Sequence, residues 1–484
     1  MPSSKIAPAA PFSGAPRINL ASVFGASPRK PFLLRIPVTG QRPITYSAQL
    51  PEGLALQDNI ITGSVQEAGD YTIRLFAENA LGKAEKTVTL EIRPEHVLVT
   101  PLLGFTSWNA FGSAVTQADM EAMAQRLEEL GLTEYGYRYV NLDSGWQSHY
   151  GGEFDAVMPN EKFPDMKAMT DRIHSLGLKC GIYSTPMLTA WGCPVEFESI
   201  PGCTVGEPDP RFTPKNGGIG LERKERNNAR QWEAWGFDYL KYDWWPTDPV
   251  NADLMRRELM QLNRDFAFNV STTAIPEYAD YWSRYCNSYR WNPDTHREWP
   301  NLLRIYRSYF RFIDYVNKGH YFDLDMLDLG TCHCHSVRGE FTEDEQVLAF
   351  SIRVILNSPI QISSTLEEPT ELELALYCNE EILAVNQDAA FCTAQPIYRL
   401  DHGDDKLDII EKELEDGSFA YAFFNIGETE QKVYSEFSCT PTLRDLWAKE
   451  DLESTQHLWL QLPPHSARIL KSSQKITAAA TATV

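Results

Sequence analysis

Carboxylates and tryptophans follow short apolar runs in the middle of the chain. The run FDYLKYD, residues 237–243, ends on Asp243, and two tryptophans come directly after it. A second carboxylate, Asp294, ends the segment YRWNPD, residues 289–294. Two carboxylates that face each other can supply a nucleophile or base and an acid at a glycosidic carbon. An aspartate after an apolar run can equally begin a turn or cap a helix, so neither position decides the chemistry alone.

Further polar residues stand at the ends of other apolar runs. They are Trp108, Asp143, Tyr183, Lys241, Arg290, Asp323 and Asp325. Charged side chains can hold sugar hydroxyls, and tryptophan rings can cover the C–H faces of a sugar. Lys241 is expected to keep Asp243 ionised, whereas Asp294, expected to be further from fixed positive charge, could stay protonated long enough to donate. Structural alternatives are a turn at Asp294 and an ion-pair role for Arg290.

The apolar runs must be strands for these residues to meet. Between residues 98 and 390 the strand-like runs are LLGFTSW, YRYVNLD, LKCGIYS, FDYLKYD, FAFNVS, NSYRWN, HYFDLDM and PIQISS. Stretches with apolar residues every three or four positions, such as QADMEAMAQRLEELG, lie between them and predict helices. Eight alternating units predict a (β/α)8 TIM barrel, in which all strand carboxyl ends meet at one face. A doubly wound sheet competes, but the sequence has no GxGxxG or Walker loop.

Strand-like runs separated by turn signals also flank the barrel. Residues 30–97 predict an immunoglobulin-like β-sandwich, with a structural or adhesive role, and residues 391–472 predict a C-terminal antiparallel β-sandwich. Residues 1–29 are expected to be disordered or extended. Residues 473–484 are expected to be a disordered, dispensable tail.

The composition limits the classes of partner. The 484 residues include 66 acidic and 44 basic ones, a net charge of −22 that argues against nucleic acid or an anionic membrane surface. No apolar run is long enough to predict a membrane span. The first residues lack the apolar stretch of a secretory signal, so a cytoplasmic or an already trimmed, exported protein is expected, and the compartment stays open. The sequence indicates no oligomeric state.

Nine segments in a fixed order resemble those of glycoside hydrolase family 27, the clan D α-galactosidases. They are GFTSW, LDSGW, GIYS, YLKYD, YRWNPD, DLDML, ILNSPI, AVNQD and LRDLW, spread over residues 100–470. The resemblance implies a retaining, exo-acting hydrolase of terminal α-galactosyl residues in oligosaccharides or glycoconjugates, with no metal or organic cofactor. It implies Asp243 as nucleophile and Asp294 as acid/base. It also implies that the sugar pocket is lined by Trp108, Asp143, Tyr183, Lys241, Arg290 and Asp325.

Two departures from the family pattern concern the sugar. Ser144 stands where the family has a second adjacent aspartate, and Ser271-Thr272-Thr273 replace a Cys-Glu-Trp segment near the sugar 2-position. The alternatives are therefore an α-N-acetylgalactosaminidase, a β-L-arabinopyranosidase or an α-glucan-directed enzyme. A non-catalytic carbohydrate-binding protein and a structural surface protein are alternatives from other classes.

The nine cysteines do not form a disulfide framework by their spacing. Because the family's partner positions are Gly145 and Ser271 here, Cys286 is expected to be a free, buried thiol. Cys193 and Cys203 lie in an insertion at 191–218, which is expected at the pocket rim, and could pair in an oxidising compartment. The CHCH run at 332–335 lacks the spacing of a zinc site, and its histidines are expected near the substrate.

Overall fold

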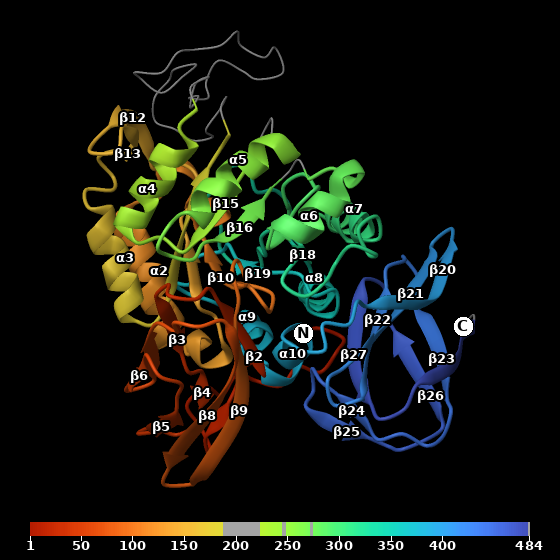
Figure 1. Cartoon of the computed structure of the whole chain (residues 1–484). Coiled ribbons are helices and arrows are strands. Elements are labelled where there is room, and N and C mark those ends of the chain that lie inside the picture. The colour runs from red at the N-terminus through yellow and green to blue at the C-terminus, as the bar shows by residue number, and fades with distance from the viewer. Residues whose placement is uncertain (187–222, 244–247, 272–273, 483–484) are drawn as a thin grey trace.

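The computed structural model describes residues 1–186, 223–243, 248–271 and 274–482 of the chain (Figure 1). A central barrel is flanked by two β-rich units. The residues that precede the barrel in the chain form the first, coloured red to orange in Figure 1, and those that follow it form the second, coloured blue. Within the described residues, no helix has both the length and the apolar character needed to cross a membrane.

Eight parallel strands form the central sheet, and each lies within one of the eight predicted runs. They are β10 (Leu103–Thr106), β11 (Tyr139–Asn141), β14 (Lys179–Ser184), β15 (Tyr239–Tyr242), β16 (Ala267–Val270), β17 (Ser288–Tyr289), β18 (Tyr321–Phe322) and β19 (Ile360–Ile362). Their order in the sheet is β18-β17-β16-β15-β14-β11-β10-β19. A parallel bridge from Leu327 to Ile362 joins the two outer strands. The sheet therefore curls into the predicted barrel.

Helices surround this sheet (Figure 1). They are α1 (Ser107–Phe111), α2 (Gln117–Glu129), α3 (Met166–Ser175), α4 (Glu225–Trp235), α5 (Pro249–Met260), α6 (Ala279–Tyr285), α7 (Trp299–Tyr309), α8 (Glu343–Ile355), α9 (Glu371–Tyr377) and α10 (Glu380–Asn386), with short 3-10 turns η1 (Gly112–Ala114), η2 (Leu132–Tyr135) and η3 (Pro276–Tyr278). Thr116 and Thr342 begin α2 and α8 with complete capping boxes, which satisfy the free amides of the first turn. A hairpin of β12 (Gln147–Gly151) and β13 (Ala156–Pro159) follows β11.

The N-terminal unit is built from small sheets packed around one apolar core. Its strands are β1 (Arg17–Ile18), β2 (Val23–Ala26), β3 (Phe32–Arg35), β4 (Val38–Thr39), β5 (Thr45–Gln49), β6 (Leu54–Gln57), β7 (Ile60–Gly63), β8 (Gly69–Asn79) and β9 (Gly82–Ile92). The sheet β2-β9-β8-β5 and the sheet β3-β7-β6 both contribute side chains to the core. The strands already begin within the expected N-terminal segment, because β2 pairs with β9. The immunoglobulin-like assignment stays a prediction.

The C-terminal unit is the predicted antiparallel β-sandwich. Its strands are β20 (Gln395–His402), β21 (Asp405–Glu413), β22 (Phe419–Asn425), β23 (Gln431–Phe437), β24 (Leu443–Asp445), β25 (Glu450–Leu452), β26 (His457–Leu462), β27 (Ser466–Ser472) and β28 (Ile476–Ala482). The sheets β20-β21-β22-β27-β24-β25 and β26-β23-β28 enclose a core of their own.

The expected disordered tail is wrong for residues 476–482. These residues form β28, which pairs antiparallel with β23 and closes one edge of the three-stranded sheet. The backbone of β23 offers a row of unpaired donors and acceptors at this edge, so even an alanine- and threonine-rich segment can pair there. Ile476 anchors the strand by burying its side chain in the sandwich core.

The barrel and the C-terminal sandwich share one continuous core. The outer face of the six-stranded sheet packs on α8, and Phe424, Trp447 and Ile469 belong to the same apolar cluster as the barrel strands. The indole of Trp447 donates to Ser351 Oγ on α8 at 3.0 Å. This arrangement explains why α8 is buried along almost its whole length. The core of the N-terminal unit is a separate cluster.

Candidate active site

The predicted site residues come from the carboxyl ends of six barrel strands. Asp143 follows β11, Tyr183 lies in β14, Lys241 and Asp243 end β15, Arg290 follows β17, and Asp325 comes after β18. Trp108 does not close β10 as expected but is the second residue of α1, which begins directly after that strand. Parallel strands place these ends at one face of the barrel. We call β11, β14 and β15 with their polar residues the Lys241 side, and β17 and β18 with theirs the Arg290 side.

A buried ion pair organises the Lys241 side. Lys241 Nζ lies 2.7 Å from Asp143 Oδ2, and both side chains are largely shielded from solvent. The other Asp143 oxygen accepts the backbone N–H of Ser144 at 2.8 Å, and Ser107 Oγ accepts the backbone N–H of Asp143. Burial alone would lower the pKa of Lys241, but the carboxylates of Asp143 and Asp243 raise it to about 12. The ammonium is therefore charged at every physiological pH.

Tyr183 lies beneath the same cluster. The Lys241 ammonium is 5.6 Å from the centre of the Tyr183 ring. Burial, followed by the negative charges of Asp243 and Asp143, raises the pKa of Tyr183 well above its usual range. The phenol therefore stays neutral and can act only as a hydrogen-bonding group.

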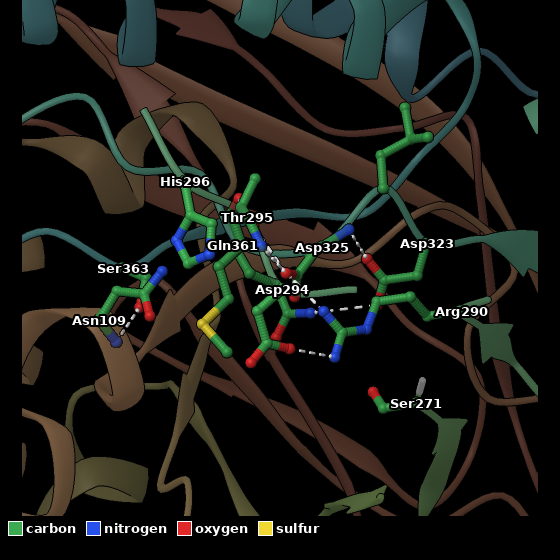
Figure 2. Close-up of polar contacts among 12 residues, drawn as sticks. Asn109, Ser271, Arg290, Asp294, Thr295, His296, Asp323, Asp325, Gln361 and Ser363 are labelled. Carbon is green, nitrogen blue, oxygen red and sulfur yellow. Dashed lines mark hydrogen bonds and ion pairs between the residues drawn. The ribbon is translucent and has the colours of Figure 1, made fainter. Parts of the chain in front are cut away.

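Arg290 connects two aspartates on the Arg290 side (Figure 2). Its Nη2 lies 2.8 Å from Asp294 Oδ1, and its Nη1 lies 2.5 Å from Asp325 Oδ2. The guanidinium is 1% exposed, whereas the Asp294 side chain is 59% exposed. Burial alone would lower the pKa of Arg290, but Asp325 and Asp294 raise it above its usual range. Arg290 is thus both a structural ion-pair partner and a wall of the site.

The expectation that Asp294 lies away from fixed positive charge is wrong. The chain turns after β17 so that the side chains of Arg290 and Asp294, four residues apart, meet in an ion pair. Sequence spacing beyond the end of a strand does not determine the path of a loop, so this contact could not be derived from YRWNPD.

Asp325 is held in an unusual backbone conformation. Its φ of +69° lies in the left-handed region, which an aspartate adopts at some cost. Thr295 compensates by donating to Asp325 Oδ2 from its backbone N–H at 2.7 Å and from its hydroxyl at 2.6 Å (Figure 2). Burial alone would raise the pKa of Asp325, but Arg290, Lys241 and these bonds lower it. Asp325 is therefore a fixed anion on the Arg290 side.

Asp323 lies behind Asp325 and behaves differently. Its Oδ2 accepts a hydrogen bond from Asn269 at 3.0 Å, and its Oδ1 accepts the backbone N–H of Asp325 at 2.9 Å. Burial and the charge of Asp325 raise the pKa of Asp323 to about 6. Its charge therefore changes just below neutral pH.

Two residues of the site, Arg353 and Thr295, gave only a weak signal in the sequence. Arg353 on α8 is buried and donates to the carbonyls of Leu324 at 3.0 Å and Met326 at 2.7 Å, which supports the strained turn at Asp325. Thr295 directly follows the predicted Asp294 in the sequence, so adjacency to a motif was its only signal. An arginine at a buried position of an apolar helix was the only sequence signal for Arg353.

The charges of Asp243 and Asp294 shift the pKa values of the same two neighbours. Asp243 is buried, and its backbone N–H donates to Ser184 O at 2.9 Å, which extends the pairing of β14 and β15. The charges of both aspartates raise the pKa of Tyr183, and both also raise that of Arg290. The strand register supports this, because Tyr242 pairs with Val270 and Val270 pairs with Tyr289, so that Asp243 and Arg290 leave the sheet at the same level, and Asp294 is ion-paired with Arg290. Both carboxylates therefore belong to the carboxyl end of the barrel.

Trp108 is placed by its neighbour on α1. Asn109 Nδ2 donates to Asp328 Oδ2 at 2.6 Å, and Ser363 Oγ accepts the Asn109 backbone N–H at 3.0 Å. Figure 2 shows Asn109 and Ser363 side by side next to the aspartate cluster. Burial raises the pKa of Asp328 to about 7. These contacts fix the start of α1 and with it the half-buried Trp108.

Some predictions fall on residues outside those described. They concern Trp244, Trp245, Thr272, Thr273 and the whole insertion at 191–218, which includes Cys193 and Cys203. Ser144 and Ser271 are described, and both are buried. Ser271 Oγ donates to Asn269 Oδ1 at 2.8 Å, so Ser271 joins the polar layer below Asp323.

The cysteines and the CHCH run contribute no metal cluster in the described part of the chain. Cys286 is free and buried, which confirms that prediction, and burial raises the pKa of its thiol. In the CHCH loop, the backbone of His333 bonds to Ala110, and its ring stacks on Phe111 with centroids 6.5 Å apart. The loop therefore covers α1.

Comparison with known proteins identifies the lineage. The domain family described as "Alpha galactosidase A" matches residues 106–202, and "Alpha galactosidase C-terminal beta sandwich domain" matches residues 404–472. Alpha-galactosidase A of Cellvibrio japonicus is 25% identical over 414 residues, which cover 79% of this chain and 94% of that protein. Alpha-galactosidase of Cyamopsis tetragonoloba is 26% identical over 406 residues, which cover 81% and 86%. This chain belongs to glycoside hydrolase family 27.

Solved structures extend the likeness of this family-27 glycoside hydrolase beyond the barrel. A crystal structure from Bacteroides fragilis NCTC 9343, with a provisional α-galactosidase assignment, has a TM-score of 0.83 and 27% identity, and it covers 96% of this chain and 98% of that one. A family-27 β-L-arabinopyranosidase from Geobacillus stearothermophilus has a TM-score of 0.66 and 25% identity, with coverage of 77% and 96%. The N-terminal unit therefore has a counterpart in the first relative's chain.

Proposed function

We propose that this family-27 enzyme is a retaining, exo-acting α-galactosidase that removes terminal α-galactosyl residues from oligosaccharides or glycoconjugates. The observation that carries the proposal is that the paired strands β15, β16 and β17 bring Asp243 and Arg290 to the same end of the barrel, where Arg290 is ion-paired with Asp294. The relatives' printed activities support the choice of sugar.

The proposed mechanism is double displacement. Asp243 attacks the anomeric carbon while Asp294 protonates the departing glycosidic oxygen, and the sugar becomes covalently attached to Asp243. Asp294 then removes a proton from a water molecule, which attacks the same carbon and restores Asp243. Net retention of the anomeric configuration follows from the two inversions.

The ion pair of Asp294 with Arg290 sets a requirement on this mechanism. Arg290 Nη2 lies 2.8 Å from Asp294 Oδ1 in the free enzyme, whereas in the first step Asp294 must donate a proton to the departing oxygen. Bound substrate must therefore draw Asp294 out of its ion pair with Arg290 before this transfer. Arg290 retains Asp325 as a partner when Asp294 moves.

The remaining pocket residues are proposed to hold the sugar. The Asp143–Lys241 pair offers a fixed acceptor and a fixed donor to hydroxyls, and Asp325 offers a second acceptor. Trp108 on α1 offers an aromatic surface for the C–H face of the ring.

A second candidate is the same mechanism with another sugar. Ser144 is buried, and its hydroxyl has no hydrogen-bond partner in the described parts of the chain, where the family carries a carboxylate. A β-L-arabinopyranoside differs from an α-galactoside by lacking the C6 hydroxymethyl group, and a relative with that activity has a similar fold. An α-N-acetylgalactosaminide differs at C2.

A panel of nitrophenyl glycosides that differ at C2 and C5 tests the proposal. We expect release of nitrophenol from the α-galactoside, with the α-anomer of galactose as first product by NMR. Asp243→Ala should abolish this activity, and azide should restore part of it as the β-galactosyl azide. Inverted product, or full activity in Asp243→Ala, would overturn the mechanism, and a preference for another glycoside would select the second candidate.

A further inference from the structure

A second concave surface lies beside the active-site loop. It is a groove of about 540 Å3 between α7 and the loop that precedes Asp294. We call it the arginine groove and define it by the residues Trp291, Asn292, Pro293, Arg304, Arg307 and Arg311. The last described residue of its loop wall, Pro293, is joined directly to the proposed acid/base Asp294.

Three arginines line one side of the groove. Arg304 and Arg307 are three residues apart on α7, and Arg311 lies four residues further in the turn after it, so the three share one face. All three side chains are exposed. The C-terminal dipole of α7 accounts for a basic residue in its last turn, but Arg304 lies in the middle of the helix.

The three arginines carry charge that the described protein does not neutralise. None of them is in ion-pair contact with a carboxylate among residues 1–186, 223–243, 248–271 and 274–482, and Arg311 instead lies 4.7 Å over the ring of Trp291. Asp408, which feels the charge of Arg307, is bonded to Tyr306 and Arg399. In a chain of net charge −22, three such neighbours point to an external anion.

An amide in the wall supplies a further observation. Asn292 is 2% exposed, and its Nδ2 is a buried donor without a partner in the described structure. Such donors are rare because burial removes their hydration without replacing it by a bond. The loop wall of the groove therefore carries one unsatisfied amide group beside the three arginines.

The chemistry of the groove indicates an acidic sugar chain. Guanidinium groups bind sulfate and carboxylate in a bidentate manner. Trp291 and Pro293 provide apolar surface of the kind that packs on sugar C–H faces. An acidic peptide would share the first feature but would not need the aromatic wall beside a glycosidase loop.

We propose that the arginine groove binds anionic groups of the glycan whose terminal sugar is removed at Asp243 and Asp294. The proposal rests on the proposed function, because it assigns the groove to the remainder of that substrate. The enzyme would then act on sulfated or uronic-acid-containing glycans, and the groove would raise their affinity without taking part in bond cleavage.

Binding to the full-length Asp243→Ala protein tests this directly, because that variant leaves the ligand intact. The probes are a sulfated galacto-oligosaccharide, an oligogalacturonate, a neutral galacto-oligosaccharide and poly-glutamate. Calorimetry at 50 and 200 mM salt measures the affinity of the protein for each. We expect one acidic oligosaccharide to bind more tightly than the neutral one and to lose affinity with salt. The better acidic probe distinguishes sulfate from carboxylate.

Charge reversal then locates the site. The double variant Arg304→Glu with Arg307→Glu should weaken binding of the acidic oligosaccharide at least about tenfold, a change of about 1.4 kcal/mol. The double variant Arg304→Lys with Arg307→Lys keeps the charge and should retain part of the affinity. The matched control is Arg226→Glu with Arg230→Glu, two exposed arginines of α4 with no ion pair among the described residues. It changes the net charge equally and should leave the affinity unchanged.

Three results would overturn the inference: no binding of either acidic oligosaccharide, equal losses in the two double variants, or tighter binding of poly-glutamate. Hydrolysis of nitrophenyl α-galactoside by the α7 variant in an otherwise wild-type chain should remain normal. If the wild-type enzyme fails to hydrolyse it, the proposed function fails instead, and the binding data still report on the groove.

Discussion

The two sides of the barrel's polar face hold their charges in different ways. On the Lys241 side, a lysine and an aspartate neutralise each other and are both buried. On the Arg290 side, one buried arginine serves two aspartates, of which Asp325 is buried and Asp294 is exposed. A closed pair can only position a ligand, whereas a shared arginine leaves one carboxylate able to exchange its partner and its proton. We therefore propose that the Lys241 side supplies the nucleophile Asp243 and positions the sugar through its ion pair, whereas the Arg290 side supplies the proton donor Asp294.

After loss of the nucleophile, the largest effect should come from removing the exposed carboxylate. Asp294→Ala should lower kcat about 10²- to 10⁴-fold on a glycoside with a poorly acidic leaving group, because no group then protonates the departing oxygen. A dinitrophenyl glycoside needs no such proton, so its cleavage to the covalent intermediate should be nearly normal in pre-steady-state bursts. Equal losses of this first step for both substrates would remove the distinction between the two sides.

Breaking the closed pair should affect stability as well as activity. Lys241→Met leaves Asp143 buried without its partner, and the free energy of unfolding should fall by about 3–5 kcal/mol. Denaturant unfolding measures this loss. The control is Lys179→Met, at the start of the neighbouring strand β14, because Lys179 has no ion pair in the described part of the protein. A stable Lys241→Met protein would show that the pair is not structurally required.

The pH dependence of stability should report Asp323. Its pKa is about 6 in the folded protein and lower in the unfolded chain, so the folded state holds the extra proton between about pH 4 and 6. The contribution of Asp323 to stability is therefore full below pH 4 and is lost as the pH rises through 6. Asp323→Asn should reduce the slope of the melting temperature with pH between about pH 4 and 6.

Asp238 provides a comparison of opposite sign for this measurement. Although burial alone would raise it, its pKa is held at about 2 by His174 and Arg264, so its stabilising contribution is lost only as the pH falls from about 4 to 2. Asp238→Asn should leave the slope between pH 4 and 6 as it is in the wild type. A change of that slope in Asp238→Asn, or none in Asp323→Asn, would contradict the assignment.

The smallest effect should come from the residue that holds Asp325. Thr295→Val removes one hydrogen bond to a buried carboxylate, which should cost about 1.5–3 kcal/mol of stability. Thr295→Ser retains the hydroxyl and should restore most of it. If both variants melt alike, the backbone N–H of Thr295 is enough to hold Asp325.

The sequence predicted the barrel strands because each joins an apolar run to a polar end. Asp143 and Lys241 could be placed in one site because their strands are neighbours in a barrel. The ion pair of Asp294 with Arg290 could not be predicted, since it depends on the loop path after β17. Strand β28 was missed because its alanines and threonines resemble a flexible tail, and only the open edge of β23 makes them a strand.

The elevated pKa of Asp323 was also beyond prediction. Nothing in DLDM distinguishes Asp323 from Asp325, and the two differ only in which cations and donors the folded chain brings to them. Burial decides the first, whereas Arg290 and Thr295 decide the second. Local sequence thus located the site but not the charge state of its members.

The continuous core of barrel and C-terminal sandwich has a consequence for unfolding. Separation of the two would expose α8 on its sandwich side, including Trp447 and the apolar face of β22 and β27. They should consequently melt in one calorimetric transition, as a single cooperative body. The N-terminal unit, which encloses a cluster of its own, is free to lose its structure in a separate step.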